Sequence, residues 1–320
     1  MTDAFLDLPC PSPGGADRNG QRPGMNTGLH DLESRTRLLD LPIGMIDDLC
    51  REGAHSEAGP EGFSHDFQIC LPYRGLFVWH VAGEDVVGDP NQIVFVRSGE
   101  PFRMRDPLAE GYAELIITPD VEVLSEIAHI PGEHLAQHPL FKRRSWRAQP
   151  GFQSFGARLR QWAVAGSLKD TLEAEELVLA LLRAALRPDG HRQTPNGTRT
   201  ASLVRRTKEF LEAHLATRIL LADIAREVRA SPAYLTDLFT RVEGISLHHY
   251  LTQLRLARAL AELPDADDLT GLALDLGFSS HSHFTFAFRR AFGCTPSDFR
   301  DAARRAAPPV AIRRRSDFRA

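Results

Sequence analysis

The stretch "LALDLGFSSHSHFTFAFRRAFGCTPSDFR", residues 272–300, interleaves phenylalanines with arginines and histidines. Phe284, Phe288 and Phe292 recur every four residues, which is the spacing of one face of an α-helix. We expect this stripe to be hydrophobic core that fixes the helix to its support. The basic residues of the same stretch are expected to face outward, so the stretch predicts a helix with one buried aromatic face and one cationic exposed face.

An earlier segment of the chain repeats this apolar pattern. Each copy reads as a short helix with a small residue, a tight turn and a second helix, which is the order of a helix-turn-helix. Ser231 and Ser280 stand where N-cap hydroxyls are expected, and Pro232 fits a first helical position. The corresponding apolar positions, with one extra residue in the second turn, are Leu221, Ile224, Ala225, Val228, Leu235 and Phe239 in the first copy and Leu269, Leu272, Ala273, Leu276, Phe284 and Phe288 in the second.

The segment "SLHHYLTQLRLARALAEL", residues 246–263, lies between the two copies and has helical apolar spacing. At about 1.5 Å per residue it would form a rod of roughly 27 Å. Successive major grooves on one face of DNA are about 34 Å apart. A connecting helix of this length therefore predicts two second helices placed to read two neighbouring grooves.

These segments closely resemble the DNA-binding domain of the AraC/XylS family of bacterial transcription regulators. The resemblance is carried by "LLADIAREV", by "SPAYLTDLFTRVEGISLHHYLTQLRLARAL" and by the quoted stretch at residues 272–300, over about a hundred residues. Two departures stand out. Arg229 occupies a turn position where the family usually has glycine, and Asp237 and Phe286 occupy recognition-helix positions where it often has arginine. These departures predict a strained or altered first turn and place the family's usual guanine reading in doubt.

The resemblance implies a regulator that binds double-stranded promoter DNA, with RNA polymerase as a possible further partner. Arginines near the predicted DNA face are expected to meet phosphates, which would supply sequence-independent, salt-sensitive affinity. The predicted base contacts are Ala233, Thr236, Asp237, His281, Ser282, Thr285 and Phe286. The predicted phosphate contacts are Ser231, Arg241, Arg255, Ser280, Arg289, Arg290 and Arg300.

The amino-terminal half has a different pattern. Short apolar runs such as "FQICL", "GLFVWHV", "QIVFV" and "AELIIT" are separated by turn residues, which predicts an antiparallel β-barrel or sandwich. Two amphipathic helices are expected between residues 152 and 186, with apolar faces that pack on the barrel or on a second copy in a homodimer.

Together these patterns predict an α+β multidomain protein. The resemblance implies that the amino-terminal domain is a cupin-like β-barrel with two following helices. It implies likewise that the carboxyl-terminal domain is all-α, with two helix-turn-helix units joined by a linker helix. The expected boundaries are a flexible tail at 1–35, a sensing and dimerisation domain at 40–188, a linker at 189–200, the DNA-binding domain at 201–305 and a basic tail at 306–320.

Aromatic residues with cations in the barrel suit a pocket for a small organic acid effector, and the candidate lining residues are Tyr73, Arg74, Trp79, His80 and Arg97. Core or surface roles are the stronger interpretation for each. The H-x-H spacing of His281 and His283 points the two side chains about 200° apart on a helix, and His80 with Glu84 is too small a ligand set. We therefore expect no metal and no cofactor.

Bulk composition sets looser limits. The 320 residues suggest two domains, and the net charge of -4 does not by itself indicate nucleic-acid binding. The charge is uneven, because residues 200–320 carry 18 Lys and Arg against 14 Asp and Glu. Four scattered cysteines, the lack of a signal peptide and the lack of a long apolar run predict free thiols in a soluble cytoplasmic protein, and the resemblance implies a bacterial one.

Three functional classes remain open from the sequence. The first is a ligand-responsive transcription regulator, and the resemblance implies that it activates transcription. The second is an enzyme fused to this kind of DNA-binding domain, either a metal-dependent cupin or a methyl-accepting repair protein. Its scattered cysteines and few ligands count against it. The third is an architectural DNA-binding protein that senses nothing.

Overall fold

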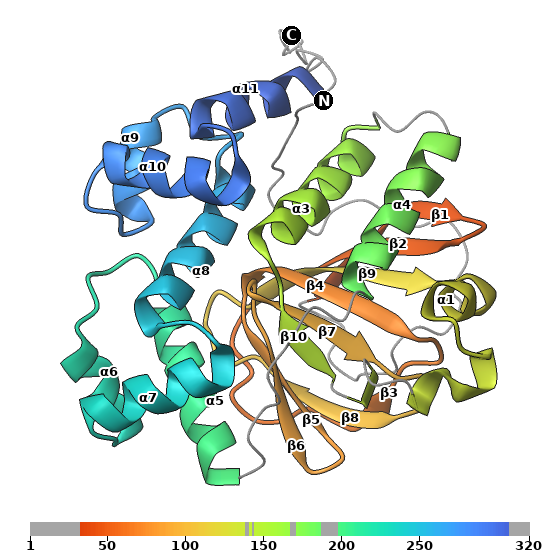
Figure 1. Ribbon diagram of the computed structural model, residues 1–320, viewed down its shortest axis with the longest axis horizontal. Helices are drawn as coiled ribbons and strands as arrows, with labels where there is room; N and C mark the ends of the chain where they lie inside the picture. Colours follow the sequence, from red (N-terminus) through yellow and green to blue (C-terminus); the bar gives the residue numbers. More distant parts are fainter. Residues whose placement is uncertain (1–32, 138–140, 143, 167–170, 187–197, 307–320) are drawn as a thin grey trace, which may run out of the picture.

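The computed structural model describes residues 33–137, 141–142, 144–166, 171–186 and 198–306. Most of the predicted amino-terminal tail, most of the predicted linker and nearly all of the predicted basic tail lie outside these residues, as does Cys10. The described chain forms a strand-rich amino-terminal domain and an all-helical carboxyl-terminal domain, as the sequence predicts (Figure 1).

The strands of the amino-terminal domain pair antiparallel in two separate sheets. The described strands are therefore not hydrogen-bonded into one closed barrel. The six-stranded sheet has the order β1 (Glu33–Leu41), β2 (Gly44–Arg51), β9 (Tyr112–Pro119), β4 (Gln68–Gly75), β7 (Gln92–Val96) and β10 (Ser145–Arg147). The four-stranded sheet has the order β3 (Gly62–Phe63), β8 (Pro101–Arg105), β5 (Phe77–Val81) and β6 (Glu84–Gly88).

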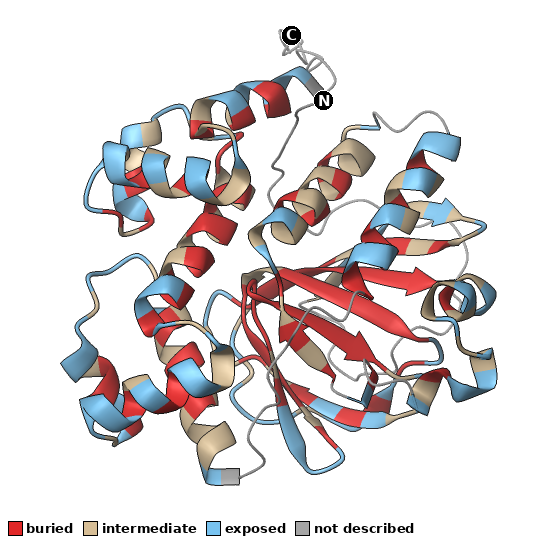
Figure 2. Cartoon of the chain, viewed as in Figure 1, coloured by how far each residue is buried: buried red, intermediate tan, exposed pale blue. Residues whose placement is uncertain are grey.

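The inner strands of the six-stranded sheet are buried on both faces. One face meets the smaller sheet, where Phe77, Trp79 and Phe102 pack with residues of β7 and β9. The other face meets α1 (Val121–Ala128), η1 (Gly132–Gln137), α3 (Pro150–Val164) and α4 (Thr171–Ala185). Burial on two faces explains why every residue of β9 is buried (Figure 2). The two predicted amphipathic helices are confirmed as α3 and α4.

The carboxyl-terminal domain has two small cores that share one helix. The amino-terminal half of the linker helix gives Tyr250 and Leu254 to the first core, and its carboxyl-terminal half gives Leu256 and Leu260 to the second. Figure 1 shows one helix pair near each end of this linker helix. The described helices are α5 (Thr198–Ala213), α6 (Leu221–Val228), α7 (Pro232–Glu243), α8 (Leu247–Glu262), α9 (Leu269–Asp275), α10 (His281–Phe292) and α11 (Pro296–Ala306).

The cysteines depart in part from the sequence prediction. Cys70 and Cys294 are free thiols, whereas Cys50 on β2 is disulfide-bonded. The prediction of free thiols throughout is therefore wrong at Cys50, because pairing depends on which distant segments the fold brings to β2. Within the described residues, no helix is long and apolar enough to cross a membrane.

Candidate nucleic-acid interface

The first helix-turn-helix consists of α6 and α7. Arg229 ends α6 in the left-handed region, with φ of 54°, and the amide of Ala230 donates to the carbonyl of Ala225 at 3.0 Å. Ser231 then caps α7, since its hydroxyl accepts the amide of Tyr234 at 3.3 Å. The turn keeps the compact form that glycine usually permits, and an arginine carries the unfavourable backbone conformation.

The second helix-turn-helix, α9 and α10, repeats this geometry with one more residue in the turn. Gly277 adopts φ of 77°, and the amide of Phe278 donates to the carbonyl of Ala273 at 2.9 Å. Ser280 caps α10 by accepting the amide of His283 at 3.1 Å. Both predicted N-caps and the extra turn residue are thus found where the sequence places them.

The outer faces of α7 and α10 carry the predicted base-contact residues. Thr236, His281 and Thr285 are half-buried, and the hydroxyl of Thr236 donates to a carbonyl one turn earlier in its own helix. The remaining predicted base-contact residues, Ala233, Asp237, Ser282 and Phe286, are exposed. Sequence reasoning missed Tyr234, which is 51% exposed beside Ala233 and could have been found as an aromatic residue off the buried stripe of α7.

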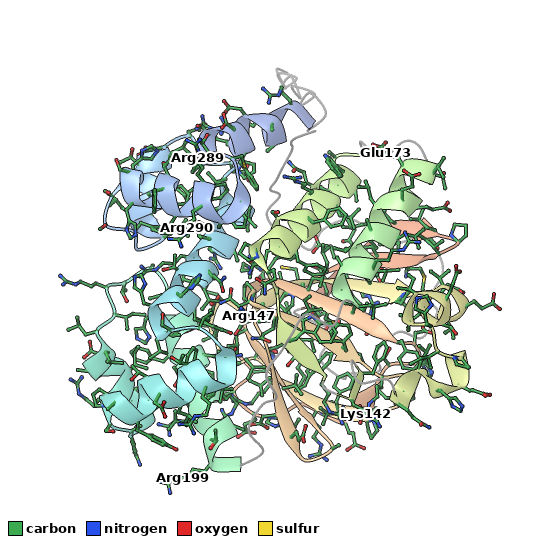
Figure 3. All side chains as sticks on the ribbon, viewed as in Figure 1. Lys142, Arg147, Glu173, Arg199, Arg289 and Arg290 are labelled. Atoms are coloured by element: carbon green, nitrogen blue, oxygen red, sulfur yellow. The ribbon has the colours of Figure 1, made fainter. Side chains whose placement is uncertain are left out.

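The arginines predicted to meet phosphate differ in how they are engaged. Arg289 and Arg290, marked on α10 in Figure 3, are exposed, and neither forms an ion pair within the described part of the chain. Arg241 at the end of α7 is also exposed but pairs with Asp237 one turn earlier. Arg289 and Arg290 can therefore bind an anion directly, whereas Arg241 must first break its ion pair with Asp237.

Arg255 and Arg300 are engaged inside the domain. The Arg255 guanidinium donates to the carbonyls of Leu215 at 2.9 Å and Thr217 at 2.8 Å, beyond the end of α5. Arg300 donates to the carbonyl of Ala266 at 3.2 Å. These contacts brace the loops around α8, so the structure does not favour either side chain as a phosphate ligand. The sequence could not reveal this, because these three carbonyl groups lie 34 to 40 residues from the arginines along the chain.

The residues predicted to line an effector pocket do not converge. Trp79 is core between the two sheets, and its indole donates to the sulfur of Met104 at 3.1 Å. Arg74 donates to the Cys50 sulfur at 2.9 Å. Two more pair locally: His80 with Asp85 at 2.5 Å, and Arg97 with Glu100 at 2.6 Å. Within the described residues, no group of three or more His, Cys, Asp or Glu side chains is arranged to hold a metal.

Tyr73, the remaining one of those five residues, lines a cavity between the two domains. Its volume is about 40 Å³, which is room for about three water molecules. Burial raises the pKa of Tyr73, so its hydroxyl stays protonated and donates to Asp48 at 2.7 Å. The walls come from β4, β9, α3 and α8 and from the ends of β7 and β10: Leu71, Pro72, Tyr73, Pro90, Gln92, Leu115, Ala148, Phe152, Gln153, Gly156, Ala157, Arg160, Ala257, Leu260 and Ala261.

A buried polar network joins the first helix-turn-helix to the sheet domain. The Tyr250 hydroxyl on α8 donates to the fully buried Asp89 at 2.6 Å, and the Asn91 amide donates to the Tyr250 carbonyl at 3.0 Å. Glu243, the last residue of α7, accepts from Gln92 at 3.1 Å and pairs with Lys208 at 2.8 Å. Fully satisfied buried networks fix geometry tightly, so the end of α7 and the start of α8 are held to the sheet domain.

One further contact ties the sheet domain to the tail of the first recognition helix. Arg147, the last residue of β10 and marked in Figure 3, donates to the backbone carbonyl of Glu243 at 3.0 Å. A cation at the carboxyl-terminal end of a helix is favourable because that end carries unpaired carbonyl groups.

Comparison with known proteins agrees with this geometry. Residues 224–302 match the family model described as a helix-turn-helix domain, which spans both helix pairs and α8. This match agrees with the two helix-turn-helix units of the carboxyl-terminal domain and with the sequence resemblance to the AraC/XylS DNA-binding domain.

The chain is similar to several named regulators over part of its length. It is 36% identical over 95 residues to the HTH-type transcriptional regulator ExsA of Pseudomonas aeruginosa, covering 29% of this chain and 34% of ExsA. It is 32% identical over 143 residues to the virulence regulon transcriptional activator VirF of Yersinia enterocolitica, covering 42% of this chain and 49% of VirF. The chain thus matches a third to a half of the length of these relatives.

Among solved structures, ToxT from Vibrio cholerae aligns over 88% of this chain and 99% of its own, with 10% identity and a TM-score of 0.32. A TM-score this low supports no inference about the sheet domain.

Proposed function

We propose that this protein is a transcription regulator that binds promoter DNA with α7 and α10 in successive major grooves. The observation that supports it best is the pair of matching helix-turn-helix units at the two ends of α8, each with a capped and outward-facing second helix. Base reading is assigned to the seven residues predicted from the sequence together with Tyr234. Phosphate contact is assigned chiefly to Arg289 and Arg290.

Activation of transcription is part of the proposal, since VirF of Yersinia enterocolitica is named an activator. An activator acts by contacting RNA polymerase, which we include as a partner. A homodimer formed through α3 and α4 also belongs to the proposal. The exposed Leu172 at the start of α4 supports that surface, because it is 62% exposed while other apolar residues of the same helix are buried.

The experiment that tests the proposal is selection of bound sequences from random duplex DNA with the full chain. The proposal expects an enriched site with two half-sites about 10 base pairs apart, because that spacing places successive major grooves on one face of the duplex. Selection with a variant that carries Phe286→Ala and Ser282→Ala is the comparison. It should relax the sequence preference in one half-site alone. Failure to enrich any sequence would overturn the assignment.

A further inference from the structure

The cavity between the two domains is bounded on one side by the sheet domain and on the other by α8. Its floor comes from Leu71 and Leu115, and α3 contributes Phe152 and Ala157. Ala257, Leu260 and Ala261 close it from the carboxyl-terminal half of α8. The cavity is therefore the place where a small molecule would touch the sheet domain and the DNA-binding domain together.

The polar groups that line this cavity are already engaged with other parts of the protein. Tyr73 donates to Asp48, and the Arg160 guanidinium donates to the same carboxylate at 2.8 Å while lying 4.4 Å from the Tyr73 ring centroid. The Gln153 amide donates to the Pro90 carbonyl at 2.6 Å. Gln92 belongs to the buried network described above.

This arrangement decides the charge of an occupant. Arg160 carries the single formal charge among the lining residues, and Asp48 balances it. An anion entering the cavity would have to compete with that carboxylate while losing its own hydration, which is costly in an apolar site. An uncharged apolar molecule faces neither cost and gains from the aliphatic and aromatic walls.

The volume decides what such an occupant does. Space for about three waters is too small for most organic ligands, so a larger molecule must move α3 and the carboxyl-terminal half of α8 apart. Both of these segments support the second helix-turn-helix, because α10 packs on α3 and Ala157 packs against the second core. The first helix-turn-helix is held by the network around Asp89 and Tyr250 instead.

We propose that this cavity is an effector site for an uncharged, largely apolar small molecule, and that occupation shifts the second helix-turn-helix relative to the first. This inference rests on the proposed function, since a change in the spacing of two readers matters only if both contact DNA. It also replaces the organic acid effector and the dispersed residues predicted from the sequence by a neutral ligand and a single site between the domains.

The test uses the full chain and two fluorescent probes that differ by one anionic group: neutral N-phenyl-1-naphthylamine and its sulfonated relative, 8-anilino-1-naphthalenesulfonate. We expect the neutral probe to bind with a Kd at least about tenfold lower than that of the sulfonate. Ala257→Leu, which fills the cavity, should weaken binding of the neutral probe by at least about tenfold. Ala213→Leu is the matched control, because Ala213 is exposed at the end of α5, and it should leave both Kd values unchanged.

A second variant decides the matter if Ala257→Leu fails to fold. Asp48→Asn keeps the shape of the side chain but removes the charge that balances Arg160, so affinity for the sulfonate should rise by about tenfold. Equal binding of the two probes to the unaltered chain would overturn the proposal, as would an Asp48→Asn variant that gains no affinity for the anion. Because these titrations contain no DNA, they can fail while the sequence selection succeeds, and the reverse also holds.

The coupling is measured in a separate titration of the selected DNA site. Saturating neutral probe should change the affinity of the full chain for that site by about fivefold or more, within the usual range of allosteric coupling. The change should depend on half-site spacing and should be lost in Ala257→Leu. A DNA affinity that is unaffected at every spacing would overturn the regulatory part of the proposal.

Discussion

The two helix-turn-helix units both have a left-handed residue at the start of the turn, but they differ in how they are supported. In the first unit an arginine adopts the left-handed conformation, and a buried polar network holds the end of α7 to the sheet domain. In the second unit a glycine adopts that conformation, and α10 rests on α3 through apolar packing beside a cavity. Polar networks require one geometry, whereas apolar contacts tolerate sliding. The comparison indicates that the first unit is the fixed reader and the second the adjustable one.

The largest expected effect tests which unit supplies electrostatic affinity. Arg289→Ala with Arg290→Ala should lower affinity for DNA by about ten- to a hundredfold and reduce the slope of log K against log salt by about 2, because two phosphate contacts are lost. Arg241→Ala should do less, since Arg241 already pairs with Asp237. Fluorescence anisotropy at several salt concentrations measures both. The control is Arg183→Ala on the exposed face of α4, and an unchanged slope in the double variant would contradict the assignment.

A smaller effect is expected from the turn of the second unit. A Cβ atom at Gly277 would lie 3.0 Å from the Leu215 carbonyl oxygen and 2.5 Å from the Arg255 guanidinium. Gly277→Ala should therefore lower the free energy of unfolding by about 1–3 kcal/mol, through positive φ and crowding together. Urea denaturation followed by circular dichroism measures this. Gly293→Ala is the comparison, because Gly293 also has positive φ but no atom near its Cβ position, so it should cost less.

A substitution at the equivalent position of the first unit is expected to change the free energy of unfolding in the opposite direction. Arg229→Gly should raise the free energy of unfolding by about 0.5–1 kcal/mol, because relief of a strained φ outweighs the greater flexibility of glycine in the unfolded chain. Affinity for DNA should remain unchanged, since the shape of the turn is already that of the second unit. Loss of stability in Arg229→Gly would show that the Arg229 side chain makes a stabilising contact.

The smallest effect concerns the junction between the domains and depends on pH. Burial raises the pKa of Glu212 on α5 from 4.5 to about 8, and the nearby Asp89 carboxylate adds to the shift. A raised folded-state pKa gives stability that is complete at low pH and is lost as the pH rises toward 8. Glu212→Gln should therefore be more stable than the unaltered chain at pH 8 and no more stable at pH 5. Part of the side chain still reaches solvent, which keeps the effect small.

Chemical denaturation across this pH range provides the measurement. Glu173→Gln on the exposed first turn of α4 is the control and should leave the profile unchanged. Parallel profiles for Glu212→Gln and the unaltered chain would show that Glu212 titrates normally.

The sequence predicted those features that depend on local chemistry. Ser231 and Ser280 were identifiable as caps because an N-cap needs only the helix that follows it. The strands predicted from the apolar runs are confirmed. They could be recognised because a strand that is buried on both faces consists mostly of consecutive apolar residues. β1 was missed, since an edge strand with exposed charged residues and a bulge after Arg37 carries no clear alternation. The segments of β6 and β8 read as turns in the sequence, because each strand is short and bears charged residues.

The cavity and the polar network could not be predicted in the same way. The Tyr250 hydroxyl and Asp89 are 161 residues apart in the chain, and nothing in either neighbourhood specifies the other. The aromatic and basic residues of the strands predict a pocket by their type, but Trp79 packs between the sheets and Arg97 pairs with Glu100. The packing of the two sheets decides which aromatic residue lies in the core and which lines a cavity. That packing cannot be read from the sequence.

The contact of α8 with the sheet domain has a practical consequence for the expression of the carboxyl-terminal domain by itself. A recombinant fragment that begins at α5 would carry an uncovered apolar strip at Ala257 and Ala261, together with a Tyr250 hydroxyl deprived of its carboxylate acceptor. Such a fragment is expected to aggregate during purification. Replacing Ala257 and Ala261 by glutamine would reduce aggregation of the fragment. The same change would remove the apolar surface with which α8 contacts the sheet domain.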